Sequence, residues 1–178
     1  PEKELLSQEI LLKISNDHFI KNTVQEDVNL RLFDALLTQL DSEKIYFTKN
    51  EVASFNKKFS ESSLVINLTD SYVFMNLYFN RLLEAANYQI REIEKKNFDF
   101  YADEEIFISN DQKDWGNSKF ALRQSWKKLA KNDVLTSMLA DNNLDEATEI
   151  ILKRYKNRIR QISQRNEEDI FSIVMNNL

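Results

Sequence analysis

The sequence predicts an all-α protein, an irregular bundle of about six or seven helices with one long central helix and a long ordered connector. Its 178 residues include a single Gly and a single Pro, the latter at position 1. Strands joined by tight turns usually need several residues that tolerate positive φ, whereas helices joined by Asn, Asp and Ser need almost none. Apolar residues also repeat at three- and four-residue spacing along most of the chain, as they do on one face of a helix.

The composition is that of a globular protein and excludes several kinds of site. A chain of this length with 42% hydrophobic residues can bury its own core, so we expect residues 1–178 to form one domain. The absence of Cys excludes disulfides, thiolate zinc sites and cysteine nucleophiles. The net charge of −5 disfavours binding to nucleic acid, and no apolar run approaches the length of about 18 residues that suggests a membrane span.

Three segments fit the capping box that begins many helices. In this motif a polar side chain accepts a hydrogen bond from the backbone N–H three residues on, and the Glu at that position accepts one from the backbone N–H of the first residue. The three segments are "TVQE" at residues 23–26, "TKNE" at residues 48–51 and, in a weaker version, Asn143 with Glu146. Each precedes apolar residues that share one helical face. We therefore predict helices after each of these starts.

The longest predicted helix covers residues 71–95, capped by Thr69 or Asp70, and at 1.5 Å per residue it is about 38 Å long. Further helices are predicted near residues 4–13 and 118–140. Residues 97–117 are too long for an ordinary connection and carry several aromatic and aliphatic side chains, so we expect an ordered excursion packed on the helices. These side chains are Phe98, Phe100, Tyr101, Ile106, Phe107 and Ile108. Residues 62–68 are expected to be a short linker that could be extended.

The end of the chain predicts one more amphipathic helix. Ile170, Phe171, Val174, Met175 and Leu178 repeat at helical spacing, and no Gly, Asn-Gly or Pro stop signal follows them. This pattern suggests that the chain is a fragment of something longer.

The sequence offers no candidate catalytic, cofactor-binding or metal-binding residues. His18 is the only histidine, which is too few for a zinc site without other strong ligands. One Gly cannot build a Gly-x-Ser-x-Gly elbow or a phosphate-binding loop. We expect His18 to serve packing or surface hydrogen bonding, and the acidic run at residues 103–105 to be a solvated loop.

Two further features have more than one interpretation. A basic run without an acid between Glu149 and Glu167 fits a nucleic-acid footprint, a contact with a domain or partner, or, as the favoured reading, a solvated surface. Trp126 shares a helical side with Leu122 and Leu129 and is expected in the core, with a binding hot spot as the alternative. The cations of the run are Lys153, Arg154, Lys156, Arg158, Arg160 and Arg165.

The stretch "RYKNRIRQISQRNEEDIFSIVMN" combines an Arg-Tyr pair, a basic helix and an Asp-Ile-Phe step. It resembles the segment that closes the N-terminal helical domain of the tail-specific (carboxy-terminal processing) serine proteases of the long periplasmic type. In that family an Asp-Pro-His-Thr turn and a PDZ domain follow, so the resemblance predicts that this chain stops just before such a domain. The matching residues are Arg154, Tyr155, Asp169, Ile170 and Phe171.

Three other stretches resemble the same family in the same order, so that the resemblance covers essentially the whole chain. The first is "HF" at residues 18–19, where the family often has His-Tyr. The second is "LTQLDSEKIYFTKNEVASF" at residues 37–55, in which Ser42 replaces the usual Pro. The third is "SWKKLAKNDVL" at residues 125–135. The residues that match in the second and third stretches are Leu40, Asp41, Lys44, Tyr46, Phe47, Phe55, Trp126, Lys128, Lys131, Asn132, Asp133 and Leu135.

The resemblance implies that the chain is a non-catalytic helical scaffold of a periplasmic serine endopeptidase. The Ser/Lys dyad, the PDZ domain and the signal peptide would lie outside this chain. The implied partners are the PDZ and protease domains of the same protein, unfolded or C-terminally exposed protein substrates, and a helical-repeat lipoprotein as adaptor, with no nucleic acid, cofactor or membrane span.

Two alternatives stay open at this point. A free-standing helical interaction module predicts that residues 170–178 bury against this same domain. A nucleic-acid-binding bundle that uses residues 153–165 predicts a steep salt dependence of binding, and the acidic composition makes it the weaker alternative.

Overall fold

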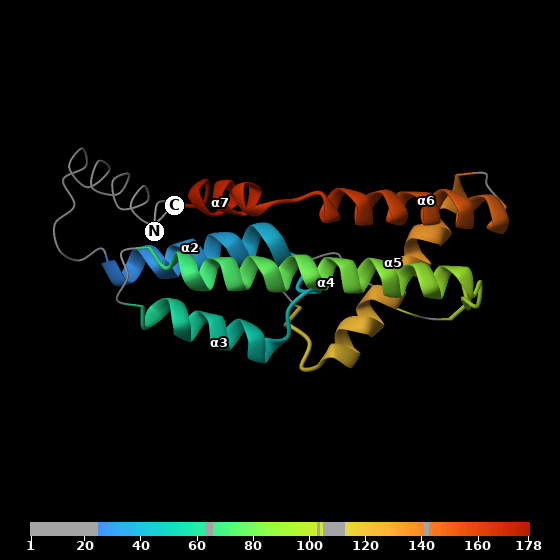
Figure 1. The fold of residues 1–178 in the computed structure, drawn as a ribbon. Helices are drawn as coiled ribbons and strands as arrows, with labels where there is room; N and C mark the ends of the chain where they lie inside the picture. The colour runs from blue at the N-terminus through green and yellow to red at the C-terminus, as the bar shows by residue number, and fades with distance from the viewer. Residues whose placement is uncertain (1–24, 63–65, 103, 105–112, 141–142) are drawn as a thin grey trace. The chain divides into compact units, whose positions relative to one another are not determined.

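A computed structural model describes residues 25–62, 66–102, 104, 113–140 and 143–178, and it is helical throughout its regular structure (Figure 1). No strand occurs among the described residues, which confirms the predicted all-α class. None of the described helices combines the length and apolar character needed to cross a membrane. The helices are α2 (Gln25–Asp41), α3 (Lys49–Ser60), α4 (Leu68–Glu94), α5 (Lys119–Leu139), α6 (Leu144–Ser163) and α7 (Glu167–Met175).

The chain forms two compact units that share α4. The first unit comprises Pro1–Ser42, Asn50–Asn76 and Asn166–Leu178, and it therefore contains α2, nearly all of α3, the beginning of α4 and α7. The second unit comprises Glu43–Lys49 and Leu77–Arg165, with the remainder of α4, α5 and α6.

The core of the first unit is built on packed aromatic rings, which belong to four of the twelve Phe residues of the chain. The Phe33 ring lies 5.2 Å from that of Phe59 and 5.4 Å from that of Phe74, and the Phe55 ring lies 5.1 Å from Phe74. All four side chains are buried. Edge-on and offset contacts of this kind add to the hydrophobic gain from burial, so these rings hold α2, α3 and α4 together.

The last helix contributes to the same unit through its apolar face. Ile170 and Val174 of α7 are buried, whereas Leu178, just beyond the helix, is 42% exposed. Asn177 also donates a hydrogen bond from Nδ2 to Oε1 of Gln39 on α2, at 2.7 Å. The predicted amphipathic helix therefore exists, and it ends at Met175, before Leu178.

The second unit has two hydrophobic clusters. The larger one uses alanines on each of its three helices, and small side chains allow helix axes to approach closely. The smaller one surrounds Trp126 and includes Ile45, Ala85 and Leu122. The buried members of the larger cluster are Ala86, Ile93, Ala130, Val134, Ala147, Ile151 and Tyr155.

Most predicted helix starts agree with the structure. Asn143 forms a complete capping box with Glu146 before α6, and α3 begins at Lys49, immediately after Thr48. Ser118 caps α5 by accepting a hydrogen bond from the Ala121 N–H. The box at residues 23–26 begins outside the described residues, as does the whole helix predicted near 4–13.

The predicted cap of α4 is wrong. The helix begins at Leu68, so Asn67 is the cap in place of Thr69 or Asp70. Its side-chain Oδ1 accepts a hydrogen bond from the Asp70 backbone N–H at 3.1 Å. Three neighbouring polar residues could each serve as cap. The position is decided by burial, because Asn67 is only 2% exposed and its backbone N–H donates to Asn29 Oδ1 on α2.

The connector at residues 97–117 is only partly as predicted. Phe98 and Phe100 pack against the larger cluster, as expected, with their rings 5.9 Å apart. Tyr101 is instead fully exposed, at 100%. Its N–H donates to Asp99 Oδ1 at 3.0 Å, a local turn that redirects the backbone after Phe100. Ile106, Phe107 and Ile108 lie outside the described residues, as do residues 63–65 of the predicted linker.

Candidate functional site

The family-like motif residues fall into both compact units, and most of them lie in the second. Leu40, Asp41, Asp169 and Phe171 belong to the first unit. The residues in the second unit are Lys44, Tyr46, Phe47, Trp126, Lys131, Asn132, Asp133, Arg154 and Tyr155. Three groups of contacts account for most of these positions.

Trp126 joins the loop after α2 to α5. Its indole ring is fully buried, and Nε1 donates a hydrogen bond to the backbone carbonyl of Ile45 at 2.8 Å. On the other side, Gln89 Nε2 on α4 donates to the Trp126 carbonyl at 3.2 Å. The Tyr88 ring packs edge-on against the indole, 6.1 Å away. Trp126 therefore links the motif stretches at residues 37–55 and 125–135.

Tyr155 joins α6 to α5. Its hydroxyl donates to Asp133 Oδ2 at 2.9 Å, and its ring is nearly fully buried in the larger cluster. Burial, followed by the neighbouring Asp133 carboxylate, raises the pKa of the Tyr155 phenol well above its usual value. The phenol is therefore a neutral hydrogen-bond donor at physiological pH. The Arg158 guanidinium covers the other side of the ring, 5.3 Å from its centroid.

The loop at Glu43–Lys49 is clamped to residues 113–116 by lysines on both sides. Lys44 donates to the Lys113 carbonyl and lies 4.9 Å from the Trp115 ring, while Lys113 donates to the Glu43 carbonyl at 2.7 Å. Lys44 holds a positive φ of 54°, which is unusual for a residue with a side chain. These reciprocal bonds stabilise that conformation.

Lys49 completes the same clamp. Its ammonium group pairs with Asp114 at 2.7 Å, and its backbone N–H donates to the Gly116 carbonyl at 3.0 Å. The hydrogen bond from Lys49, with one from the Trp115 N–H, lowers the pKa of the Asp114 carboxyl. Gly116 fits here because an added Cβ would lie 3.0 Å from the Ala121 side chain.

The remaining motif residues have simpler surroundings. Phe47 is buried and Tyr46 is half-buried, and both rings contact Tyr78. Lys131 pairs with Glu104 at 3.3 Å. The other positions divide by exposure: Asp41 is buried, Leu40 and Phe171 are half-buried, and Asn132 and Arg154 are exposed.

Two polar caps were missed by sequence reasoning although a signal was present. Asn166 and Asp169 form a complete capping box before α7, and Asn67 with Asp70 form a related pair before α4, where Asn67 Nδ2 donates to Asp70 Oδ2 at 2.9 Å. Both pairs read Asn-x-x-Asp. Asp at the third helical position can reach back as Glu does in the usual capping box.

The described residues contain no group of three or more His, Cys, Asp or Glu side chains that could hold a metal ion. A hollow at the start of α6 is lined by Asn143, Leu144, Asp145, Glu146 and Glu149. His18, Asp103 and Glu105 lie outside the described residues. Within the described residues, the motif side chains form contacts between helices and loops.

Comparison with known proteins supports the resemblance noted in the sequence. The model of a family described as "Tail specific protease N-terminal domain" matches residues 10–178. A relative from Haemophilus influenzae, described as a tail-specific protease, is 21% identical over 179 residues, which is 98% of this chain and 26% of the relative. The chain therefore spans about a quarter of the length of that relative.

Proposed function

Because the chain belongs to the family of tail-specific protease N-terminal domains, matched over residues 10–178, we propose that it is the helical scaffold of a larger carboxy-terminal processing serine endopeptidase. The family match over nearly the whole chain carries this proposal. The relative from Haemophilus influenzae is about four times as long as this chain, which leaves room for a protease core elsewhere in the same polypeptide.

The scaffold role is non-catalytic in this proposal. It is supported by what the motif side chains do in the second unit: Trp126 donates to a backbone carbonyl and Tyr155 donates to Asp133. These contacts hold helices and a loop in place, and a buried neutral phenol is suited to that task rather than to bond cleavage. The Ser/Lys dyad would lie in the protease core, outside this chain.

The partners in this proposal follow from the place of the domain in the protease. The chain would dock the PDZ and protease domains of the same protein in the periplasm. Its long helix α4 (Leu68–Glu94) would help to wall the path of protein substrates with exposed C-termini, and its surface would receive an adaptor such as a helical-repeat lipoprotein.

A peptidase assay tests the non-catalytic role. The 178-residue chain is incubated with a protein that ends in an unfolded apolar tail, and mass spectrometry follows the tail; the complete protease serves as positive control. We expect no cleavage by the chain alone and cleavage by the complete protease. Cleavage by the chain that disappears when one of its own Ser residues is replaced by Ala would overturn the proposal.

The alternative of a free-standing interaction module has one observation in its favour. It predicts burial of residues 170–178 against the domain, and Ile170 and Val174 are buried. The same burial is compatible with a domain of a larger protease. Sequencing the gene beyond Leu178 separates the two: a PDZ pattern and a later Ser/Lys region support the scaffold, and an early stop codon supports the module.

A further inference from the structure

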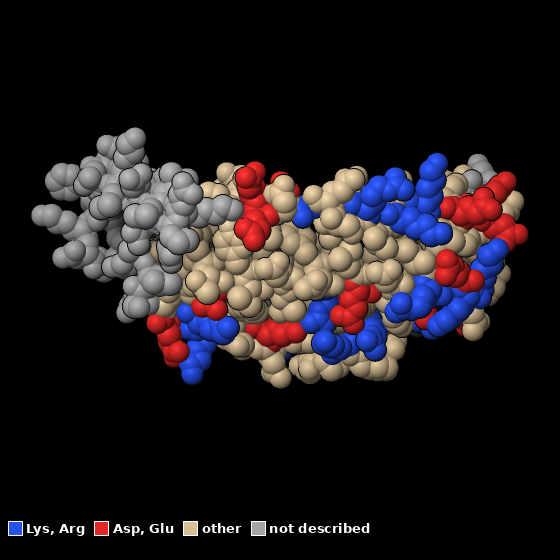
Figure 2. Space-filling view, in the orientation of Figure 1, with Lys and Arg blue, Asp and Glu red and all other residues tan. Residues whose placement is uncertain are grey.

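Helix α6 carries more exposed Lys and Arg side chains than any other helix of the described residues. We define its basic face as Lys153, Arg154, Lys156, Arg158 and Arg160, all of which are exposed. Figure 2 shows this basic surface over α6, bordered by acidic side chains toward the N-terminal end of the helix.

Cations elsewhere on the described chain are mostly matched with acids. Ion pairs join lysines of α3, of α5 and of the segment just after α4 to nearby Asp and Glu side chains. Within the described residues, Lys153, Arg154, Lys156 and Arg160 form no ion pair or hydrogen bond through their side chains. The paired lysines are Lys49, Lys57, Lys58, Lys95, Lys96, Lys127 and Lys131.

The helix dipole accounts for only part of this surface. It favours cations in the last turn, which includes Arg160, but its effect falls off within about one turn, whereas Lys153 is at the middle of α6. Lys156 and Arg160, like Arg154 and Arg158, are like charges four residues apart, a spacing that destabilises an isolated helix by a few tenths of a kcal/mol per pair. The basic face therefore opposes the stability of its own helix until an anion covers it.

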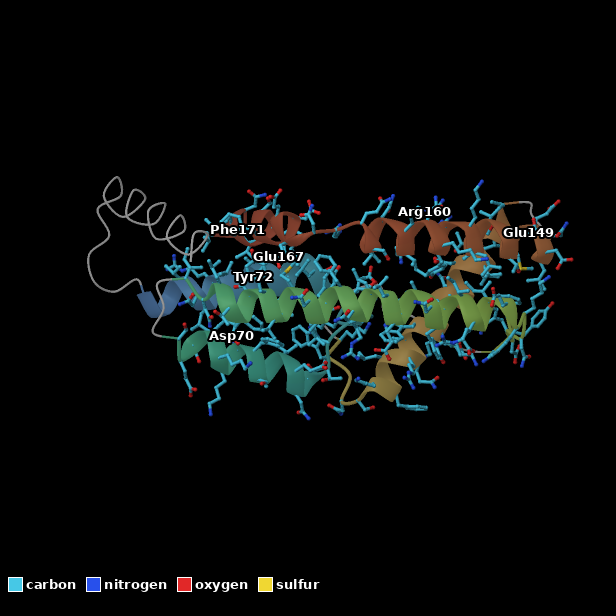
Figure 3. All side chains as sticks on the ribbon, viewed as in Figure 1. Asp70, Tyr72, Glu149, Arg160, Glu167 and Phe171 are labelled. Atoms are coloured by element: carbon cyan, nitrogen blue, oxygen red, sulfur yellow. The ribbon has the colours of Figure 1, made fainter. Side chains whose placement is uncertain are left out.

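Spacing places part of the basic face in a single outward row. Glu146, Glu149, Lys153, Lys156 and Arg160 follow one another by three, four, three and four residues, and all are exposed. Residues at this spacing lie on one side of a helix. Figure 3 labels Glu149 and Arg160 toward opposite ends of α6. The row thus runs from two acids to three cations.

This row favours a short anionic partner over a long polyanion. From Lys153 to Arg160 it covers about 10 Å of helix, enough for about three carboxylates at matching helical spacing. A nucleic acid or an anionic membrane would extend over Glu149 and Glu146 as well and be repelled there, in a chain whose net charge is −5. Ile150, 45% exposed beside the row, adds an apolar contact suited to a protein.

A second copy of the chain is the less suitable occupant. An antiparallel pair of α6 helices would place Glu146 opposite Arg160, but a two-fold axis near Lys153 would bring the two Lys153 side chains together.

We propose that the basic face of α6 is a docking surface for an acidic helical segment of a partner protein, whose carboxylates repeat at the spacing of Lys153, Lys156 and Arg160. The proposal depends on α6 alone, so its failure leaves the proposed scaffold function untouched.

The test measures binding of a labelled, alanine-based helical peptide with three Glu at i, i+3 and i+7 to the 178-residue chain by fluorescence anisotropy at low salt. The first variant combines Lys153→Gln, Lys156→Gln and Arg160→Gln. The matched control combines Lys57→Gln, Arg91→Gln and Lys119→Gln, which changes the net charge equally but at other exposed positions. A variant with Lys153→Arg and Lys156→Arg keeps the charges of the face.

We expect the first variant to weaken binding about tenfold, the control to change it less than about twofold, and the Arg variant to retain it. The same peptide with Gln in place of Glu should not bind. Equal weakening in both Gln variants would show a response to net charge only and overturn the proposal. So would tighter, face-dependent binding of a single-stranded RNA oligonucleotide, or a dimer in sedimentation that the first variant abolishes.

Discussion

Trp126 is a residue at which several contacts of the second unit meet. Its indole is buried, its Nε1 holds the Ile45 carbonyl, and its own carbonyl accepts from Gln89. A residue of this kind combines the packing of a large ring with a hydrogen bond that closes a loop 81 residues away in sequence.

The change Trp126→Phe removes the hydrogen bond and part of the packed volume. The Ile45 carbonyl then loses the hydrogen bond from Trp126, and a cavity remains beside Leu122. We expect the free energy of unfolding to fall by about 3 kcal/mol, measured by urea unfolding followed by circular dichroism. Phe120→Ala is the control, because Phe120 is 70% exposed and should change stability by less than about 0.5 kcal/mol. Equal losses in the two variants would contradict this account.

Tyr155→Phe tests the bond between α6 and α5 at little cost in packing. Loss of the donor to Asp133 should lower the free energy of unfolding by about 1 kcal/mol. A double-mutant cycle with Asp133→Ala isolates the interaction, and we expect a coupling of about 0.5–1.5 kcal/mol. Additive effects of the two changes would mean that the hydrogen bond contributes nothing to stability.

The ion pairs of Glu92 make the free energy of unfolding depend on pH. Its side chain is 11% exposed and pairs with Lys95 and Lys127. The hydrogen bond from Lys95 lowers the pKa of the Glu92 carboxyl, with further contributions from Lys127, although burial opposes this. Since the folded pKa lies below the unfolded one, this stabilisation is complete above the usual Glu pKa of about 4.3 and is lost as the pH falls through the folded value.

We therefore expect Glu92→Gln to destabilise the protein at neutral pH, with a difference from the natural chain that shrinks as the pH falls toward about 3. Urea unfolding over this range measures it. Glu94→Gln, at an exposed position two residues on, is the matched control and should show a smaller difference. A Glu92→Gln effect that stays constant with pH would exclude the ion pairs as its cause.

At the scale of the element, α4 depends on Asn67 for its start. Asn67 Oδ1 accepts the Asp70 N–H, Asn67 Nδ2 donates to Asp70, and the Asn67 N–H donates to Asn29 on α2 at 2.7 Å. Only the last of these bonds uses the backbone of Asn67, so a substitution removes the cap but spares that link.

Asn67→Ala should lower the free energy of unfolding by about 1–2 kcal/mol and speed hydrogen exchange at the first amides of α4. Asn67→Ser keeps a neutral accepting oxygen and should restore part of the loss. Asn87→Ala is the matched control, because Asn87 lies within α4 at an exposed position. Unchanged exchange at residues 69–71 in Asn67→Ala would show that another group caps the helix.

At the scale of the whole molecule, the charge balance predicts weak interaction with nucleic acid. The chain carries a net charge of −5 although α6 is locally basic. We expect no binding to duplex DNA at physiological salt in a gel-shift assay, because a polyanion meets overall repulsion. Binding that falls steeply with added salt and is lost on Arg158→Gln with Arg160→Gln would contradict this expectation.

Much of the fold could be predicted because its signals are local. The scarcity of Gly and Pro, the helical repeat of apolar residues and the capping box at Asn143 all act within a few residues of one another, so the all-α class, the start of α6 and the bounds of α5 follow from the sequence. The choice among Asn67, Thr69 and Asp70 did not follow, since all three are acceptable caps locally.

The sequence by itself determined the helical class and, through its motif residues, the family. Only the tertiary structure decided which side chains meet: Trp126 with Ile45, Tyr155 with Asp133, and Lys49 with Asp114. It also left Tyr101 in solvent while it buried its neighbours Phe98 and Phe100 in part. The physical reason is that hydrophobicity and helix propensity are properties of single residues and short segments, whereas a contact depends on where distant segments are brought together by the packing of the core.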